Sequence, residues 1–429
     1  MRPTWRSLWV VGVLLLPAVI WPQFAAWSVA GALLIGIFAY DFVACRRTAE
    51  LHVTRDVAPS LSVNREHEVA LQVRNESGRL LRIDLLDEAP EHCLPRGLPV
   101  RIVLAPRQAT EVRYTLMPAR RGDGEFGQAI CLVISPFGLW QSRQAYLTPQ
   151  RVRIYPDFAA VAGYLELLGD RQTVRLGIKK RQRRGEGLEF QQLREYRPGD
   201  TMRQIDWNAT SRRRELISRE YAEERDQRVL FLIDSGRRMR TRDHLLSHFD
   251  HALNGMLLLA YVALRQGDSV GLQLFGATRK WVPPQRGVGS VNMLLNEIYA
   301  VHSGSEQADY VTAAEELMGH ERKRALVILM TNLREEDADL LPALRLLRQR
   351  HVVVLANLRE RVLDDTLQQR PRVFRDALRL AATHDYLQER KRYQAQCTSI
   401  ANAVLDCSPQ ELPVQVVNAY WQIKLSGRL

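Results

Sequence analysis

The fold is decided by one stretch of the chain, Arg228-Val-Leu-Phe-Leu-Ile-Asp-Ser-Gly-Arg-Arg-Met239. The apolar run from Val229 to Ile233 is typical of a strand buried on both faces of a parallel sheet. Asp234 ends this run, and Ser-Gly then turns the chain into a long amphipathic segment. Because open α/β sheets bind ligands beyond the carboxyl ends of their strands, we expect Asp234 to lie at the functional site.

Downstream of this stretch, apolar runs alternate with amphipathic segments. Further buried strands are predicted at 325–330 and 352–356, a fourth strand at 403–407, and an edge hairpin over 269–282. Helices are predicted at 245–264, 291–299, 311–318, 340–347, 374–393 and 414–425. This alternation predicts an α/β fold with a doubly wound, mostly parallel sheet over 229–429.

Upstream, residues 48–160 change to a period of two. Apolar residues alternate with polar ones at 69–73, 83–85, 100–104, 112–116 and 130–134, with turn residues between them. Short half-buried strands at this spacing predict an antiparallel β-sandwich domain of immunoglobulin-like character. The Cys–Trp–Cys frame of true immunoglobulin domains is missing from this sequence.

The first 47 residues contain two apolar runs, Leu8–Trp21 and Phe24–Tyr40, separated by Pro22-Gln23. Basic residues before and after the pair favour a transmembrane helical hairpin with both termini in the cytoplasm. We therefore expect an inner (plasma) membrane protein with cytoplasmic soluble domains. A single span is the open alternative, and a cleaved signal peptide lacks its small-residue cleavage site.

The net charge indicates which partners the protein could bind, and the cysteine pattern indicates the state of its thiols. The net charge of +12 and pI near 9.7 suit nucleic acid, anionic lipid or an acidic protein as a partner. The five cysteines are scattered, with no metal-binding spacing, which favours free thiols buried as small core residues.

Residues 161–228 form a charged linker. Lys179–Arg184 is strongly basic, and Leu188–Arg212 interleaves arginine and aspartate with tyrosine and tryptophan. This pattern predicts either a hydrogen-bonded collar or an electrostatic docking face, and a solvated loop is the alternative. We expect Ile205 and Trp207 to be buried. A charge run close to a bilayer would meet membrane lipid first, so nucleic-acid binding is not expected.

Two motifs resemble those of the bacterial domain-of-unknown-function 58 family. They are Gly187-Leu-Glu-Phe…Leu193-Arg-Glu-Tyr-Arg-Pro-Gly-Asp200…Arg203-Gln-Ile-Asp-Trp207…Arg219-Glu-Tyr…Glu224-Arg225 and Glu411-Leu-Pro…Asn418-Ala-Tyr…Lys424. The resemblance implies a membrane-anchored protein with a von Willebrand factor A-like domain. It also implies an adaptor or assembly factor that works beside a MoxR-type AAA+ ATPase, often near transglutaminase-like membrane proteins. The candidate partner-binding residues are Arg194, Tyr196, Arg197, Asp200, Arg203, Asp206, Trp207, Arg219 and Tyr221.

The von Willebrand A fold implied by this resemblance holds a divalent cation through Asp-x-Ser-x-Ser, a threonine and a second aspartate. Mg²⁺ prefers such an octahedron of hard oxygens. In this chain the matching positions are Asp234, Gly236, Arg238, Asp309 and Asn332, with Ser235 at the wrong offset. We expect a degenerate cation site in which Arg237 or Arg238 neutralises Asp234. Mg²⁺ bound at Asp234, and Asp234 as a plain turn or cap residue, are the alternatives.

Enzymatic activity is not expected. The sequence contains no Walker A loop, nucleophile elbow, HExxH motif or dinucleotide fingerprint. His244, His248 and His251 share a helical face, but nearby Asp243 and Asp250 favour a solvated or capping role. The favoured function is a membrane-anchored, non-enzymatic adaptor without a cofactor. A divalent-metal-dependent binding or hydrolytic protein centred on Asp234 is the alternative.

Overall fold

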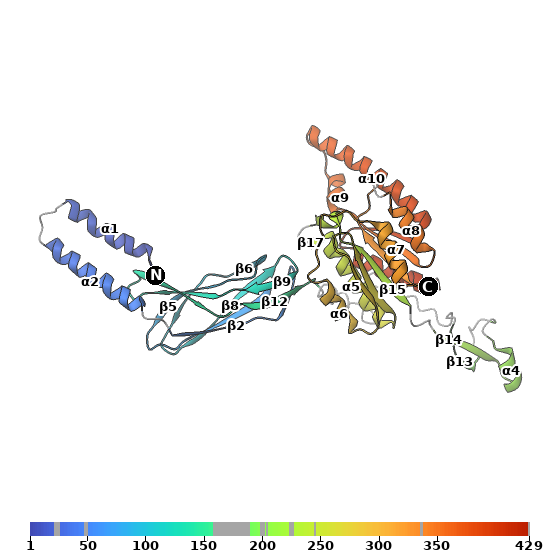
Figure 1. Cartoon of the computed structure of the whole chain (residues 1–429), viewed down its shortest axis with the longest axis horizontal. Coiled ribbons are helices and arrows are strands. Elements are labelled where there is room, and N and C mark those ends of the chain that lie inside the picture. The colour runs from blue at the N-terminus through green and yellow to red at the C-terminus, as the bar shows by residue number, and fades with distance from the viewer. Residues whose placement is uncertain are drawn as a thin grey trace. The chain divides into compact units, whose positions relative to one another are not determined.

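The computed structural model describes residues 1–20, 26–46, 50–157, 189–197, 202, 205–222, 227–243, 246–334 and 338–427 (Figure 1). The chain divides into two compact units, Met1–Tyr155 and Pro156–Leu429. Each unit has its own sheets and is described by itself.

The second unit is built on a six-stranded sheet in the order β19-β18-β15-β20-β21-β22. Its strands are β15 (Arg228–Asp234), β18 (Ser269–Phe275), β19 (Lys280–Gln285), β20 (Leu326–Thr331), β21 (Val352–Leu358) and β22 (Ala403–Cys407). All neighbouring pairs are parallel except β18 and β19, whose antiparallel pairing forms the predicted edge hairpin. The buried strands predicted at 325–330 and 352–356 are confirmed, and the fourth predicted strand is present as β22, which is mostly half-buried.

Strand β15 lies in the middle of this sheet. It pairs with β18 on one side, where Asp234 is opposite Phe275, and with β20 on the other, where Ile233 is opposite Met330. Its residues from Val229 to Asp234 are all buried, as a strand covered on both faces requires. The prediction that Asp234 lies at the carboxyl end of a central parallel strand is therefore confirmed.

Helices connect these strands. They are η2 (Arg237–Arg240, a 3₁₀ turn), α5 (His248–Arg265), α6 (Ser290–Ile298), α7 (Tyr310–His320), α8 (Leu340–Arg348), α9 (Arg361–Gln368), α10 (Phe374–Ile400) and α11 (Leu412–Leu425). Helix α5 packs against α11, and α7 packs against α8. Helix α9 was not predicted from the sequence, and none of its eight residues is buried.

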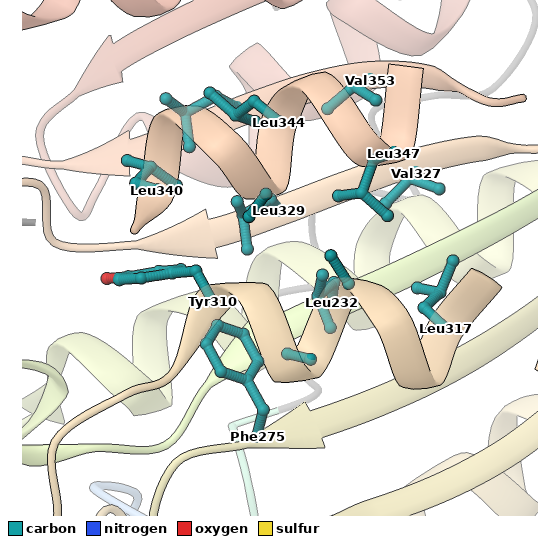
Figure 2. Packing of buried hydrophobic residues seen from close by; sticks show 14 of the residues in the cluster. Leu232, Phe275, Tyr310, Leu317, Val327, Leu329, Leu340, Leu344, Leu347 and Val353 are labelled. Carbon is teal, nitrogen blue, oxygen red and sulfur yellow. The ribbon is translucent and has the colours of Figure 1, made fainter. Parts of the chain in front are cut away.

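The core beneath α7 and α8 is shown in Figure 2. Leu232, Leu329 and Val353 from the sheet pack against Leu317 of α7 and Leu344 of α8. The rings of Phe275 and Tyr310 meet edge to face, with centroids 5.4 Å apart, which is a favoured aromatic geometry.

A salt bridge ties the last helix to the rest of this unit. The carboxylate of Asp268, which lies between α5 and β18, is fully buried. It accepts hydrogen bonds from the Tyr420 hydroxyl at 2.5 Å and from Lys424 Nζ at 2.7 Å. Two residues of the C-terminal motif therefore pair one buried charge and hold α11 in place.

Three sheets, antiparallel except for the β3–β12 pair, make up the strands of the first unit. Their strand orders are β1-β11-β10-β5-β7, β2-β4-β8-β6 and β3-β12-β9, in a sandwich-like arrangement. The strands are β1 (Arg2–Pro3), β2 (Leu51–Asp56), β3 (Ser60–Ser62), β4 (His67–Asn75), β5 (Leu81–Asp87), β6 (Cys93–Arg96), β7 (Val100–Leu104), β8 (Ala109–Pro118), β9 (Gly122–Phe126), β10 (Ala129–Ile134), β11 (Trp140–Tyr146) and β12 (Gln150–Tyr155). The alternating burial along β4 and β5 confirms the period of two.

Helices α1 (Trp5–Ile20) and α2 (Ala26–Arg46) lie between β1 and β2 in sequence. Helix α2 is attached to the β unit through Asp41, a fully buried carboxylate. It accepts hydrogen bonds from Ser135 Oγ at 2.5 Å, from the Phe137 amide at 3.0 Å and from the Leu139 amide at 3.1 Å. The carboxyl-terminal turns of α2 are thus part of a protein core.

The predicted transmembrane hairpin is wrong. Among the residues that the structure describes, no helix has the length and apolar character needed to cross a membrane. Helix α1 has 16 residues, against the roughly 20 that a hydrocarbon core requires. The inner-membrane location that depended on this hairpin is overturned with it.

The predicted fold class needs a second correction. A mostly parallel sheet describes the six-stranded sheet alone. The other sheets in the described part of the chain are antiparallel apart from the β3–β12 pair, so antiparallel pairing predominates among the described strands.

The five cysteines are buried free thiols, as the sequence predicted. Burial raises the pKa of the Cys93 thiol to about 11 and that of Cys131 to about 12. These thiols remain protonated at neutral pH and act as small core side chains.

The first prediction concerns the core under α8. Leu344→Ala removes a fully buried side chain, so we expect it to lower the free energy of unfolding by about 2–5 kcal/mol. Urea denaturation followed by circular dichroism measures this loss. The neighbouring exposed residue supplies the control, because Arg345→Ala should leave the midpoint nearly unchanged. Equal effects of the two substitutions would contradict the assignment of this core.

The second prediction concerns pH. His351 is buried just before β21, and this desolvation, helped by the charge of Arg350, lowers the pKa of its imidazole below 6.5. The unfolded state therefore binds a proton before the folded state does. The neutral imidazole of His351 contributes its full stability above the pKa that it has in the unfolded chain. This contribution is lost as the pH falls through the lower pKa that it has in the folded protein. Unfolding free energies measured from neutral to mildly acidic pH should fall less steeply in His351→Gln than in the wild type.

Candidate functional site

The candidate site is centred on Asp234, whose side chain is 1% exposed. Its Oδ1 accepts a hydrogen bond from the Gly236 amide at 2.6 Å, and its Oδ2 accepts one from Thr331 Oγ1 at 2.9 Å. Thr331 ends the neighbouring strand β20, so the bond joins the carboxyl ends of two central strands. The carboxylate is held by donors of the fold itself.

A second hydroxyl extends this arrangement. Tyr310 Oη lies 2.8 Å from Thr331 Oγ1, and both side chains are buried. A threonine hydroxyl has one proton, and here Thr331 donates it to Asp234. Tyr310 is therefore the donor to Thr331, which gives a directed chain from Tyr310 through Thr331 to Asp234.

The position that a serine would occupy in a cation motif is filled by backbone. A Cβ atom added to Gly236 would lie 2.7 Å from the Glu306 carbonyl oxygen and 3.3 Å from the Ala308 amide nitrogen. The loop is fixed there because the Arg237 amide donates to Glu306 O and the Gly304 amide donates to Ser235 O, each at 2.9 Å. A serine at 236 would require this loop to move.

Ser235 has a structural role. Its hydroxyl donates to the Phe275 carbonyl at 2.7 Å and accepts from the Thr278 amide at 2.9 Å. These bonds fix the turn after β18 against the turn after β15. The hydroxyl of Ser235 is therefore already hydrogen-bonded to backbone groups. Its position also differs from that of the serines in the cation motif, as the sequence indicated.

Asp309 forms its hydrogen bonds at the start of helix α7. It caps the start of α7, where it accepts from the Thr312 amide at 2.9 Å and the Thr312 hydroxyl at 2.6 Å. The Thr312 side-chain bond, followed by the backbone bond, lowers the pKa of the Asp309 carboxyl. Asp309 is an exposed helix cap.

Asn332 belongs to a second buried polar cluster next to Thr331. Its Nδ2 donates to Glu360 Oε1 at 3.0 Å and lies 3.4 Å from His248 Nδ1. Arg390 of α10 donates to Asn332 Oδ1 at 3.4 Å and to the Leu358 carbonyl at 2.8 Å. The amide at 332 therefore bridges helices and strand ends by hydrogen bonds.

His248 is fully buried and lies 2.9 Å from Asp243 through its Nε2, so the predicted solvated role is wrong. His244 lies outside the described residues. Asp250 forms a capping box with Ser247, which confirms the capping role predicted for that part of the face. Among the described residues, no group of three or more histidine, cysteine or acidic side chains could hold a metal ion.

The Mg²⁺ ligand set does not fit this edge of the sheet. Gly236 and Arg238 supply no hydroxyl, Gly236 has no room for one, and Asp309 is engaged as a cap. Arg237 is exposed and Arg238 half-buried on η2, and neutralisation of Asp234 by either residue stays a prediction.

The signature residues form a small module. Strands β13 (Glu189–Glu195) and β14 (Ile217–Ala222) pair antiparallel, and α4 (Trp207–Arg213) lies between them in sequence. Arg219 pairs with Leu193 across this ladder, and Tyr221 with Phe190. Asp206 caps α4 by accepting from the Ala209 amide at 3.0 Å, and the Tyr196 amide donates to Leu216 O at 2.8 Å.

The remaining signature residues are placed as follows. Arg194 Nη1 donates to the Glu195 carbonyl at 3.0 Å, and Arg197 follows the strand. Asp200 and Arg203 lie outside the described residues. Trp207 is 65% exposed, so its predicted burial is wrong, while Ile205 is half-buried. The sequence did not single out Thr331, Tyr310 or Arg390, although Thr331 directly follows a buried run and Tyr310 follows Asp309.

These observations define an α/β domain whose sheet edge is closed by internal hydrogen bonds, with a separate basic and aromatic hairpin. Residues 192–373 match the family model described as "Protein of unknown function DUF58". The family resemblance predicted from the sequence is confirmed for this segment.

Similar proteins add little beyond this match. "Uncharacterized protein YeaD" of Bacillus subtilis is 23% identical over 145 residues, which are 34% of either chain. The chain thus spans about a third of the length of this curated relative. Proximal thread matrix protein 1 from the mussel byssus aligns with a TM-score of 0.30, at 10% identity over 46% of either chain. Trypsin-activated alpha-2-macroglobulin from Escherichia coli aligns at 0.21, with 16% identity over 25% of this chain and 7% of the other. Scores of this size carry no functional argument.

The third prediction tests the hydroxyl chain. Thr331→Val keeps the side-chain shape but removes the donor to Asp234 and the acceptor of Tyr310, so we expect a loss of about 1–3 kcal/mol in the free energy of unfolding. Thr312→Val, which breaks an exposed bond to Asp309, should cost less.

Added Mg²⁺ should leave the unfolding midpoint of the wild-type protein unchanged. If Mg²⁺ raised this midpoint in the wild type but not in Asp234→Asn, the conclusion that Asp234 holds no cation would be wrong.

Proposed function

We propose that the C-terminal unit is a non-enzymatic docking module of von Willebrand A-like type. Its cation site has been replaced by internal hydrogen bonds, and it receives a MoxR-type AAA+ ATPase or that ATPase's client. Transglutaminase-like proteins are the client class that the resemblance suggests. The membrane anchor expected from the sequence is not part of this proposal.

One observation carries the proposal, namely the exposure of apolar side chains in the signature module. Trp207, Leu193 and Leu216 are 65%, 47% and 47% exposed, and helix α4 has no buried residue. Arginines 212–214 follow on the same helix and its cap. Tryptophan and arginine are both enriched where protein surfaces meet, so their exposure in this module favours a protein-binding role.

The internal hydrogen bonds around Asp234 support a non-enzymatic role. Its carboxylate accepts from Gly236 and Thr331, and Ser235 is bonded to backbone on both sides. A nucleophile needs a base within hydrogen-bond reach and a free reacting face. The alternative of a metal-dependent hydrolase at Asp234 is less well supported, because the Glu306 carbonyl fills the space of a required ligand.

The fourth prediction tests docking. The full chain is immobilised, and a purified MoxR-type ATPase from the same organism is titrated in the presence of ATP analogue or ADP. Trp207→Ala should weaken binding by about thirtyfold, the effect of losing an interface residue worth about 2 kcal/mol. Phe137→Ala, an exposed aromatic in the first unit, is the matched control and should bind like the wild type. Failure of the wild type to bind with either nucleotide would refute the proposal.

A further inference from the structure

Helix α9 and the first third of α10 form an exposed helical pair that the signature module does not involve. The two helices pack against each other (Figure 1). None of the eight residues of α9 is buried. The buried residues of α10 begin only at Thr383 and continue with Arg390, Tyr393 and Cys397.

This pair exposes large apolar side chains. Phe374 is 79% exposed, Leu378 55%, Val373 56% and Val362 62%. Phe374, Leu378 and the exposed Ala381 follow a spacing of four and three residues, which places them on one face of α10. An apolar ridge on one face of a helix can pack against the apolar stripe of a second, amphipathic helix.

Arginines flank this ridge. Arg375 and Arg379 are exposed one residue after Phe374 and Leu378, and Arg370 and Arg372 are exposed in the preceding turn. The carboxylate nearest in sequence, Asp376, is bound as a cap by the amides of residues 372 and 373 at 3.2 and 3.3 Å. The ridge therefore lies in a positive field.

The ridge is rigidly supported from the buried half of α10. Arg390 donates to the carbonyls of Leu333 and Leu358 at 2.8 Å each, and to Asp406 at 3.0 Å. These bonds join α10 to the loop after β20, to the last residue of β21 and to strand β22. A preorganised helix loses little entropy when a partner docks on it.

We infer that the face formed by Phe374, Leu378 and Ala381, with Arg375 and Arg379 beside it, is a docking site for an acidic amphipathic helix of another protein. The apolar face of that helix covers the ridge, and its flanking carboxylates pair with the arginines. This surface is distinct from the signature module, so the inference does not depend on ATPase docking there.

A protein helix fits this surface better than an anionic bilayer. Helix α9 carries Asp364 and Asp365, which lie 3.3 Å from Arg359 and 3.8 Å from Arg361 respectively. These carboxylates would oppose anionic lipid along one half of the pair, whereas a protein helix can leave them at its rim.

The fifth prediction uses a charge exchange. The probe is a fluorescent designed helix with leucines at i, i+4 and i+7 flanked by glutamates, and a second peptide carries lysines in their place. The full chain should bind the glutamate peptide at least about tenfold more tightly than the lysine peptide. The double variant Arg375→Glu/Arg379→Glu should reverse this preference, and Phe374→Ser/Leu378→Ser should abolish binding of either peptide.

Controls separate the outcomes. Arg345→Glu changes an exposed arginine on α8 and should leave the preference unchanged. Thermal unfolding of every variant should match the wild type, because the substituted side chains are exposed. Absent binding of the glutamate peptide, or equal binding by the wild type and the charge-reversed variant, would overturn the inference. So would binding to phosphatidylserine vesicles that depends on Phe374 when neither peptide binds.

Discussion

A buried carboxylate at the end of the central strand imposes the main constraint on the sheet edge. Asp234 is almost fully removed from water, so both its oxygens need donors from the surrounding fold. The Gly236 amide and the Thr331 hydroxyl supply them, and Tyr310 completes the chain. Because these donors come from the turn after β15, the end of β20 and the start of α7, those three segments are fixed relative to one another.

A second set of buried polar groups continues this edge towards β22. Asn332 is bonded to both Glu360 and Arg390, and Arg390 is bonded to backbone carbonyls, so α10 is attached to the sheet by hydrogen bonds as well as by apolar contact. The unit therefore has an edge closed by internal bonding and carries its exposed apolar groups elsewhere, on α4 and on the start of α10. This division is the basis of our proposal that the unit docks other proteins.

The sequence was informative where burial is periodic. The apolar run of β15, its end at Asp234 and the alternation along β4 and β5 all follow from side chains that face a core. It was misleading where apolar composition has more than one physical cause. The runs before residue 46 resemble membrane spans, yet Asp41 is buried by Ser135 and two amides of the β unit. Partners so distant in sequence, like Arg390 for Asn332, leave no local pattern.

The buried contacts that Asp268 makes with Tyr420 and Lys424 of α11 have a consequence for synthesis of the protein. Tyr420 lies 152 positions after the carboxylate that it covers, and Lys424 follows one turn later. While the ribosome is still translating the intervening strands and helices, Asp268 has neither partner and its surroundings must stay hydrated. The α/β unit can therefore reach its final packing only after α11 has left the exit tunnel, and until then a chaperone would find an uncovered face of α5.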